Sequence, residues 1–566
     1  MSAFDKLVKH SKKVSHFNHL SAICGWDQAA VMPTGGAQAR SEAMAELSVH
    51  IHGLMTQPQL SDWFAEAEAE SLNSEQTAAL REMKRHWQQA NVLPESLVEA
   101  KSLAGSKCEH AWRSQRKAND WVGFEKNWAE VVKLSQEEAQ IRAEATGTTP
   151  YDAMLELYEP GTTTESLNRV FSDVKSWLPE MIDQAIEKQR SESVLEPKGY
   201  YPAQNQKALG LDVMKLLQFD FNHGRLDESV HPFCGGVPSD VRITTRYNDT
   251  EFVQSLMGIV HETGHARYEQ GLPKHLAGTP AGEARSMGIH ESQSLFFEMQ
   301  LGRSPAFIDH LARLAADHFG AHNDKVFQID NIQKLYTRVK KDFIRVDADE
   351  LTYPAHVILR YEIERDLMNG VIKHTDVPEL WDEKMRASLG LSTKGNDQNG
   401  CMQDIHWTEH QSTMSTAKHD YKNGCLQDIH WCEHQSTMST AKHDYKNGCL
   451  QDIHWCEHQS TMSTAKHDYK NGCLQDIHWC DGSFGYFPSY TLGAMYAAQF
   501  MAAMRKTIDV DDVVRSGNLS PIFAWLSKNI WSKGSLLTTD ELVKAATGEV
   551  LNPEHFKNHL KSRYLG

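Results

Sequence analysis

The sequence has few cysteines outside one segment, and this argues against a fold built on disulfides. Of the ten cysteines, only Cys24, Cys108 and Cys234 lie outside a repeated stretch at about 400–480. Proteins that depend on disulfides distribute paired cysteines through their structure. We therefore expect a core of ordinary apolar side chains, for which 40% hydrophobic residues are sufficient.

The sequence also lacks a long apolar run. Its longest, 492–504, is interrupted by Gln499 and is shorter than the roughly 20 residues that cross a bilayer. The first residues are partly basic but contain no continuous apolar segment, so no secretory signal is apparent. These absences predict a cytoplasmic protein that does not interact with a membrane.

Positive charge is in deficit as well. The chain has 58 lysine and arginine residues against 75 aspartate and glutamate residues, a net charge of −17 at pH 7. Proteins that bind nucleic acids concentrate positive charge on one surface, because the phosphate backbone attracts it. The deficit predicts that nucleic acid is not a partner.

Most of the chain has a helical pattern. Up to about residue 195, Ala, Glu, Gln, Lys and Leu recur at helical spacing with little proline, which predicts a stack of long helices. Between 199 and 248, glycine, proline and β-branched residues increase, and 241–247 alternates as a strand does. We predict a small sheet there. Helical patterns return from 286 to about 388 and again from about 489.

One motif within a predicted helix indicates a catalytic metal site. The segment 261–265, His-Glu-Thr-Gly-His, has the form H-E-x-x-H. Two histidines four residues apart lie on one face of a helix, so His261 and His265 can bind one zinc ion while Glu262 faces the attacking water. The surrounding segment 250–271 has helical apolar spacing and ends at a glycine followed by a proline. This pattern predicts a hydrolase.

A second helical segment, 286–298, offers a third metal ligand. It follows a turn rich in glycine and proline, which allows it to fold back along the first helix. Glu291 would then complete a three-ligand zinc site with one position open to water. Cobalt or manganese could replace zinc there, since selectivity depends on geometry and availability. Glu298 is a candidate for orienting one histidine. The alternative is a pair of helices whose polar groups only bond to one another.

An internal repeat interrupts the helical pattern late in the chain. Gly-Cys-Met-Gln-Asp-Ile-His-Trp at 400–407 recurs, with Leu for Met, at 424–431, 448–455 and 472–479. The period is 24 residues (424 − 400), and three units make 72 residues. The copies are nearly identical, whereas old solenoid repeats diverge on their surfaces. We interpret 400–471 as a recent tandem duplication or a sequence artefact, and we expect the extra copies to form a poorly packed loop.

The repeat contains a competing zinc pattern. His406, His430 and His454 each begin an H-x-x-E-H string, which is the inverted form of the motif. The strings count as one event because they belong to duplicated units, and no separate helix supplies a third ligand. We therefore assign the catalytic metal to the segment 261–265 and regard metal binding by the repeat as incidental.

Further ordered motifs narrow the assignment. They are Trp26-Asp-Gln, Met32-Pro-x-x-Gly, His231-Pro-Phe, Asp240-Val-Arg-Ile-Thr, His290-Glu-Ser-Gln, Ile344-Arg-Val-Asp-Ala-Asp, and Gly-x-x-Gln-Asp-x-His-Trp followed by Gly485-Tyr-Phe-Pro-Ser-Tyr. Together with H-E-x-x-H, they resemble the thermostable carboxypeptidase (carboxypeptidase Taq) family of zinc metallocarboxypeptidases. The resemblance extends over essentially the whole chain apart from the repeat, and is much more specific than one motif.

The resemblance implies a fold and an assembly. It implies a mainly α fold: a large helical body split by a deep active-site cleft with a small sheet beside the zinc helix, similar to neurolysin and angiotensin-converting enzyme. The implied substrate is a peptide, and the implied assembly is a homodimer. We divide the chain into an N-terminal helical part (1–198), a catalytic core (199–399), the repeat insert (400–471) and a C-terminal cleft wall (472–566).

The resemblance also bears on the repeat, because the family carries the Gln-Asp-x-His-Trp motif once. Removing 72 residues leaves 494 (566 − 72), an ordinary length for the family. The copy at 472–479 continues directly into the Gly-Tyr-Phe segment. We therefore expect His478 at the active site, although exchange with His406 stays open.

Several residues are candidates for handling the peptide. Tyr486 or Tyr490, helped by His478, is expected to donate a hydrogen bond to the developing oxyanion. The alternative is an aromatic cluster that only packs a helix start. Arg345 is the candidate for binding the terminal carboxylate, because a guanidinium binds it in a bidentate manner. The alternative is an ion pair with Asp349 on one helix.

Two residues near the predicted sheet each have two alternative roles. His231 and Arg242 either line the cleft and bind substrate or fix the loop before the zinc helix. Asp240 and Thr244 are assigned to structure. An exposed edge of the sheet would offer an extended peptide a place to add as a strand.

The function predicted from all of this is a zinc metallocarboxypeptidase that releases single residues from peptide C-termini. One alternative is an endo-oligopeptidase or dipeptidase with the same zinc site. Another is a catalytically inert protein whose cleft is blocked by the repeat.

Overall fold

Helices make up most of the part of the chain that the computed structural model describes, residues 1–229, 232–403 and 483–566. The mainly α fold expected from the sequence is confirmed. The amino-terminal helices are α1 (Ala3–Ala30), α2 (Ala37–Met55), α3 (Gln59–Glu68), α4 (Ser74–Asn91), α5 (Glu95–Lys117), α6 (Trp121–Thr146), α7 (Pro150–Leu155) and α8 (Thr164–Gln189). The central helices are α9 (Ala203–Leu216), α10 (Val253–Gly271), α11 (Met287–Leu295), α12 (Pro305–Phe319), α13 (Ile329–Tyr336), α14 (Tyr353–Met368) and α15 (Val377–Leu389). The carboxy-terminal helices are α19 (Pro488–Met504), α20 (Val510–Arg515), α21 (Ser520–Asn529), α22 (Thr539–Thr547) and α23 (Glu554–Tyr564).

Local sequence signals set many of the helix boundaries. Ser2, Asn73 and Thr163 precede α1, α4 and α8, and their side chains accept hydrogen bonds from backbone amides of the first turn. These amides have no partner within the helix, so the caps stabilise the helix starts. Helices α6 and α12 end at Gly147 and Gly320, both in the left-handed conformation that glycine adopts without strain.

The small sheet has the strand order β1-β3-β2. Strand β1 (Gly224–Glu228) runs parallel to β3 (Asp240–Thr245), and β2 (Phe233–Val237) runs antiparallel to it with Phe233 opposite Thr244. The β2–β3 hairpin turns at Pro238 and Ser239. Within β2, Gly236 has a φ of 90° and lies so close to the Asp240 carbonyl that no Cβ would fit. The predicted strand, 241–247, thus begins one residue earlier and ends two residues earlier than expected.

The sheet packs on α10 through its apolar face. Val241 and Ile243 of β3 are fully buried and belong to one cluster with Ile259 and Ala266 of α10. Alternate residues of a strand point to the same side, so one short strand supplies this face. The helix predicted at 250–271 is therefore held by the sheet along one side.

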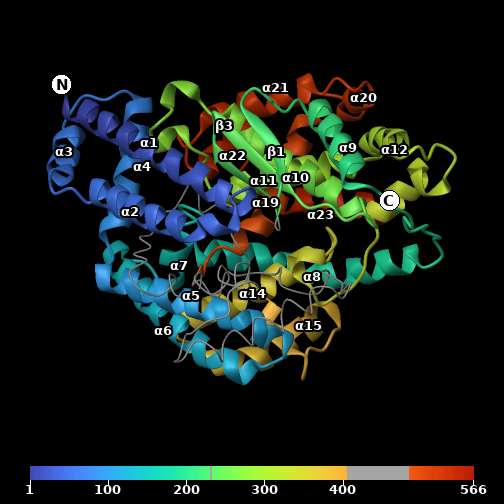
Figure 1. Ribbon diagram of the computed structural model, residues 1–566, viewed down its shortest axis with the longest axis horizontal. Helices are drawn as coiled ribbons and strands as arrows, with labels where there is room; N and C mark the ends of the chain where they lie inside the picture. The colour runs from blue at the N-terminus through green and yellow to red at the C-terminus, as the bar shows by residue number, and fades with distance from the viewer. Residues whose placement is uncertain (230–231, 404–482) are drawn as a thin grey trace, which may run out of the picture.

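The molecule has two helical parts that share a core (Figure 1). Helices α5, α6, α7, α14 and α15 lie below in the view, and the sheet with α9, α10, α12 and α20 to α22 lies above. Helices α11 and α19 pack against each other in the middle. Buried side chains of both parts belong to one continuous hydrophobic cluster. Within the described residues, no helix combines the length and the apolar character that crossing a bilayer requires.

Candidate active site

A glycine in the H-E-x-x-H segment brings α10 and α11 close together. A Cβ on Gly264 would lie 2.6 Å from both the carbonyl oxygen of Gln293 and the Cα of Ser294 on α11. Only glycine allows the two backbones to approach this closely. The approach places Glu291 of α11 opposite His265 of α10, with 3.5 Å between Oε2 of the glutamate and Nε2 of the histidine.

The three predicted metal ligands form one group. Ligand atoms of His261, His265 and Glu291 all lie within 4.8 Å of one another. The two imidazole rings are 5.0 Å apart between centroids. Nitrogen and carboxylate donors at this spacing suit a divalent metal such as zinc. The antiparallel return of the second helix, predicted from the intervening turn, accounts for the grouping.

The ring of His261 is oriented from behind by an acidic side chain. Its Nδ1 lies 2.9 Å from Oε2 of Glu298, and the other oxygen of Glu298 accepts a hydrogen bond from Arg303. This leaves Nε2 of His261 to face the other ligands. Burial by itself would raise the pKa of the Glu298 carboxyl, but Arg303 and His261 outweigh it and lower the pKa to about 2.

The ring of His265 is oriented differently, by a second histidine. Its Nδ1 lies 2.7 Å from Nδ1 of His290, and Nε2 of His290 lies 2.8 Å from Oε1 of Glu269. If His265 donates a hydrogen bond through Nδ1, then Nδ1 of His290 accepts it, and Nε2 of His290 donates its N–H to the carboxylate of Glu269. Sequence reasoning missed this role of His290, although its position beside Glu291 on a buried helix could have indicated it.

The electrostatics of the group favour a cation. Burial lowers the pKa of His261, but Glu298, Glu291 and Glu262 reverse this and raise it to about 10. Burial raises the pKa of Glu262 to about 7, and its Oε2 is buried without a hydrogen-bond partner in the described structure. An unsatisfied buried carboxylate oxygen is costly unless a charge or water meets it. These residues therefore fit a bound divalent metal.

Helix α19 closes the group from a third side. A Cβ on Gly493 would lie 2.7 Å from Cγ of Glu291, so this glycine permits direct contact between α19 and the carboxylate side chain. Tyr490 lies three residues earlier on the same helix and thus on the same side. Sequence reasoning did not identify Gly493, because its requirement arises from a neighbour 202 positions away (493 − 291).

Aromatic rings and an arginine lie next to this face. The Tyr490 ring centroid is 5.3 Å from that of Tyr486 and 6.0 Å from that of Tyr353. The guanidinium of Arg345 is 4.9 Å from the Tyr490 ring, and its Nη1 donates to the Tyr353 hydroxyl at 2.6 Å. Burial, followed by the neighbouring Tyr486, keeps the pKa of Tyr490 well above its usual value. The phenol therefore remains a hydrogen-bond donor.

Arg345 is almost completely buried, at 2% exposure. Burial raises the pKa of the Glu291 carboxyl, and the positive charge of Arg345 acts in the opposite direction. Arg345 lies in a three-residue 3-10 turn, Arg345–Asp347, rather than in an α-helix. The expectation that Arg345 and Asp349 are four apart on one helix is therefore wrong. The Asp349 carboxylate accepts from the amides of Lys340, Leu351 and Thr352 and from the Thr352 hydroxyl.

The start of the first repeat copy also contacts this region. Gln403 is fully buried, and its Oε1 accepts a hydrogen bond from the backbone amide of Arg345 at 3.0 Å. Its amide nitrogen donates to the carbonyl groups of Phe343 and Asn399. The first copy thus supports the turn that carries Arg345. His406 and His478 lie outside the described residues, as does the rest of the repeat.

Of the two candidates near the sheet, His231 also lies outside the described residues. Arg242 forms an ion pair with Asp240 at 2.8 Å, and its guanidinium lies 4.5 Å from the Trp26 ring of α1. These contacts hold α1 against the sheet, a structural role different from fixing the loop before the zinc helix. The substrate-binding role of both residues stays a prediction.

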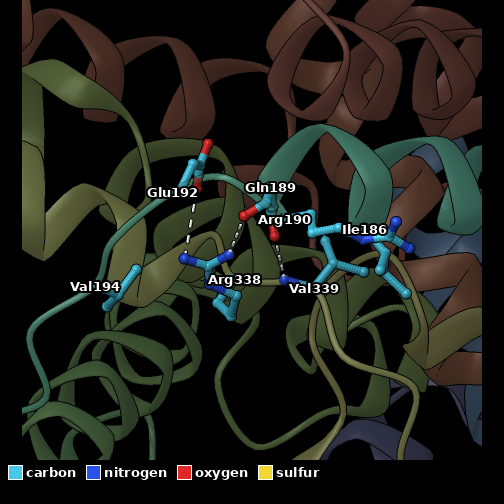
Figure 2. Close-up of a pocket in the computed structure, with 7 residues that line it drawn as sticks. All are labelled: Ile186, Gln189, Arg190, Glu192, Val194, Arg338 and Val339. Atoms are coloured by element: carbon cyan, nitrogen blue, oxygen red, sulfur yellow. Dashed lines mark hydrogen bonds and ion pairs between the residues drawn. The ribbon is translucent and has the colours of Figure 1, made fainter.

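A surface pocket of about 410 Å³ lies away from this group, between the end of α8 and the segment after α13 (Figure 2). Its polar groups bond to one another. Arg338 donates to the carbonyl of Gln189 at 3.0 Å and lies 3.5 Å from Glu192. The Gln189 side chain accepts from the amide of Val339. We assign these bonds to the packing of the two segments.

A helical body that groups the H-E-x-x-H histidines with a glutamate of the next helix defines a class, the helical metallopeptidases. The family model "Carboxypeptidase Taq (M32) metallopeptidase" matches residues 6–413 and 456–564. The chain belongs to this family and is a metallocarboxypeptidase. The residues between the two matched ranges lie within the repeated segment.

Individual relatives match this chain over nearly their full length. Thermostable carboxypeptidase 1 of Thermus thermophilus is 30% identical, with 100% of this chain and 98% of the relative covered. Carboxypeptidase 1 of Bacillus subtilis is 29% identical, with 98% and 96% covered. The solved structure of metallocarboxypeptidase 1 of Trypanosoma cruzi is similar with a TM-score of 0.85 and 41% identity, with 100% of this chain and 99% of that chain covered.

Proposed function

We propose that this metallocarboxypeptidase uses zinc, held by His261, His265 and Glu291, to release single residues from peptide C-termini. The observation that carries this proposal is the position of Arg345. Its buried guanidinium lies beside Tyr490 of α19 and Tyr353 of α14 and within electrostatic reach of Glu291. A cation next to the metal group suits the free carboxylate of a terminal residue, which an endopeptidase substrate lacks at that point.

The proposed chemistry assigns proton transfer to Glu262. A divalent metal at this site would polarise the scissile carbonyl and acidify the attacking water. The unpaired Oε2 of Glu262 would accept the water proton and pass it to the leaving amine. Tyr490 or Tyr486 would donate to the oxyanion, supported by the raised pKa that keeps Tyr490 protonated. His478 is proposed to assist them.

The proposal also covers the choice of metal, the location and the assembly. Cobalt or manganese could replace zinc with the same ligands. Among the described cysteines, Cys24 and Cys108 are free thiols, which suits the proposed cytoplasmic location. The proposed homodimer rests on the family resemblance alone.

One peptide in three forms tests the proposed specificity. Peptides with a free C-terminus, with a blocked N-terminus and with an amidated C-terminus are incubated separately with the zinc-loaded protein. We expect stepwise loss of C-terminal residues from the first two, and at least a 100-fold lower rate on the third, because the amide cannot accept a bidentate bond from Arg345. Internal cleavage of the amidated peptide would instead support the endo-oligopeptidase alternative.

Deleting residues 400–471 tests the alternative of a blocked cleft. The deletion joins Asn399 to Gly472, so Gln475 of the last copy takes the place of Gln403 in an identical local sequence except for Leu474 in place of Met402. We expect the shortened enzyme to fold and to keep kcat/KM within about threefold of the full chain, because lengthening a loop adds little closure entropy. A large gain in activity on deletion would show that the insert inhibits the enzyme, and loss of folding would show that the insert is structural.

A further inference from the structure

The carboxy-terminal helix α23 contacts the segment that orients His261. Helix α11 continues as a π-helical segment, Phe296–Gly302, and this segment carries Glu298. In the last turn of α23, Nη1 of Arg563 donates to the carbonyl oxygen of Met299 at 2.5 Å. Met299 directly follows Glu298. One hydrogen bond thus joins the end of the chain to the support of a proposed metal ligand.

The wide turn of the π-helical segment explains why an outside donor is needed. The amide of Arg303 donates to the carbonyl of Glu298 at 3.0 Å, five residues back, as in a π-helix. The next amide, of Ser304, bonds to Leu301 and leaves the regular pattern. Carbonyl groups in the last turn of a helix have no partner within it. Arg563 supplies a partner for the carbonyl of Met299.

Arg563 is itself held by a buried carboxylate. Its Nη1 also donates to Oε2 of Glu350 at 2.8 Å, and Glu350 is 1% exposed. The same carboxylate accepts from His559 at 2.7 Å and from the hydroxyl of Tyr564 at 3.0 Å. Two turns of α23 are therefore fixed to one side chain.

Acidic and basic side chains alternate between Arg563 and the proposed metal group. Glu298 pairs with Arg303, and Glu350 pairs with Arg563. Burial by itself would raise the pKa of the Glu350 carboxyl, but the charges of Arg563, His559 and Arg303 hold this pKa well below its usual value. A buried charge with a missing partner is costly, so removing one member disturbs the geometry of the others.

We propose that Arg563 is a positioning residue for the metal centre. Through Met299 and Glu350 it fixes the π-helical segment so that Glu298 holds the His261 ring toward the metal. This inference rests on the proposed function, since it requires His261 to be a metal ligand. It extends that function by making the carboxy-terminal helix part of the support of the site.

Three variants of the full chain test the proposal. Arg563→Met removes both hydrogen bonds while keeping an unbranched side chain, and Arg563→Lys keeps the charge. Lys561→Met, at an exposed position of the same helix, is the matched control. Zinc affinity is measured by competition with a chelator, and the absorption spectrum is recorded with the protein saturated with cobalt.

We expect Arg563→Met to weaken zinc binding by about 10- to 100-fold, the range that follows loss of an outer support of a metal ligand. The cobalt spectrum should change and kcat should fall with KM little altered. Arg563→Lys should recover part of both effects, and Lys561→Met should show neither. If Arg563→Met does not fold, Tyr564→Phe, which removes one bond to Glu350, should shift zinc affinity and spectrum in the same direction by less.

Two outcomes separate the inference from the proposed function. A lowered melting temperature with unchanged zinc affinity and cobalt spectrum in Arg563→Met or in the folded Tyr564→Phe would overturn the inference and leave Arg563 a structural residue. His261→Ala is measured in parallel. If His261→Ala leaves zinc affinity unchanged, the proposed metal site fails, whatever the result for Arg563.

Discussion

Glu262→Gln should retain the metal and lower kcat by roughly 10⁴-fold, the upper end of what a positioned general base contributes. The amide keeps the shape of the side chain but cannot accept the proton of the attacking water. Metal content is measured on the purified protein and kcat on a peptide with a free C-terminus. The exposed Glu383→Gln serves as the control and should be indistinguishable from wild type.

The pH profile gives a second measure of the same group. Burial raises the pKa of Glu262 to about 7 in the metal-free protein, and a bound cation would lower it. Because the base must be ionised, kcat/KM of the metal-loaded enzyme should fall as the pH is lowered through the pKa that Glu262 has with the metal bound. The same acidic limb should be lost from the residual activity of Glu262→Gln. Substantial turnover by a metal-loaded Glu262→Gln protein would remove Glu262 as the base.

Removing the metal provides a reference for this experiment. Treatment with a chelator should abolish the activity of the wild type, and zinc added back should restore it. Restoration by zinc distinguishes loss of metal from unfolding.

Arg345→Met should lower kcat/KM on free-acid peptides by about 10²- to 10³-fold. Loss of one partner from a buried charged pair costs about 3 to 4 kcal/mol, within the range measured at interfaces. Methionine preserves contact with the Tyr490 ring but offers no donor, whereas Arg345→Lys should give an intermediate loss because it keeps the charge without the planar fork.

A matched control for Arg345 lies in the surface pocket. Arg338→Met removes an arginine whose guanidinium bonds to Gln189 and Glu192, and it should leave kcat/KM unchanged (Figure 2). The decisive comparison uses amidated peptide. If Arg345→Met lowers activity equally on free-acid and amidated peptides, Arg345 does not recognise the terminal carboxylate.

Local patterns predicted those parts of the site that depend on residues close in sequence. The spacing of His261 and His265 is a property of any α-helix, and the helix expected at 250–271 is observed at Val253–Gly271. The turn before α11 predicted the return that brings Glu291 to the histidines. Glu298 was one candidate for orienting a histidine, but the sequence did not show which acidic group does so or which histidine it orients.

Patterns failed where local geometry was irregular. The helix expected around Arg345 is a short 3-10 turn, because Asp349 accepts the backbone amides of Leu351 and Thr352 and so stops helical pairing there. The segment expected as one helix from 286 to 298 changes to a π-helix at Phe296. Over so few residues, the spacing of apolar side chains in a 3-10 turn or a π-helical segment does not differ detectably from the spacing in an ordinary α-helix.

The sequence alone determined the helical class, the proposed ligand residues and the repeat, because these follow from spacing, composition and near-exact recurrence along the chain. Only the tertiary structure decided which groups orient the ligands. The bond between His265 and His290, the contact of Gly493 with Glu291 and the link from Arg563 to Met299 join separate helices. Such contacts depend on how helices pack in three dimensions, and a single sequence carries no periodic signal for the distance between them.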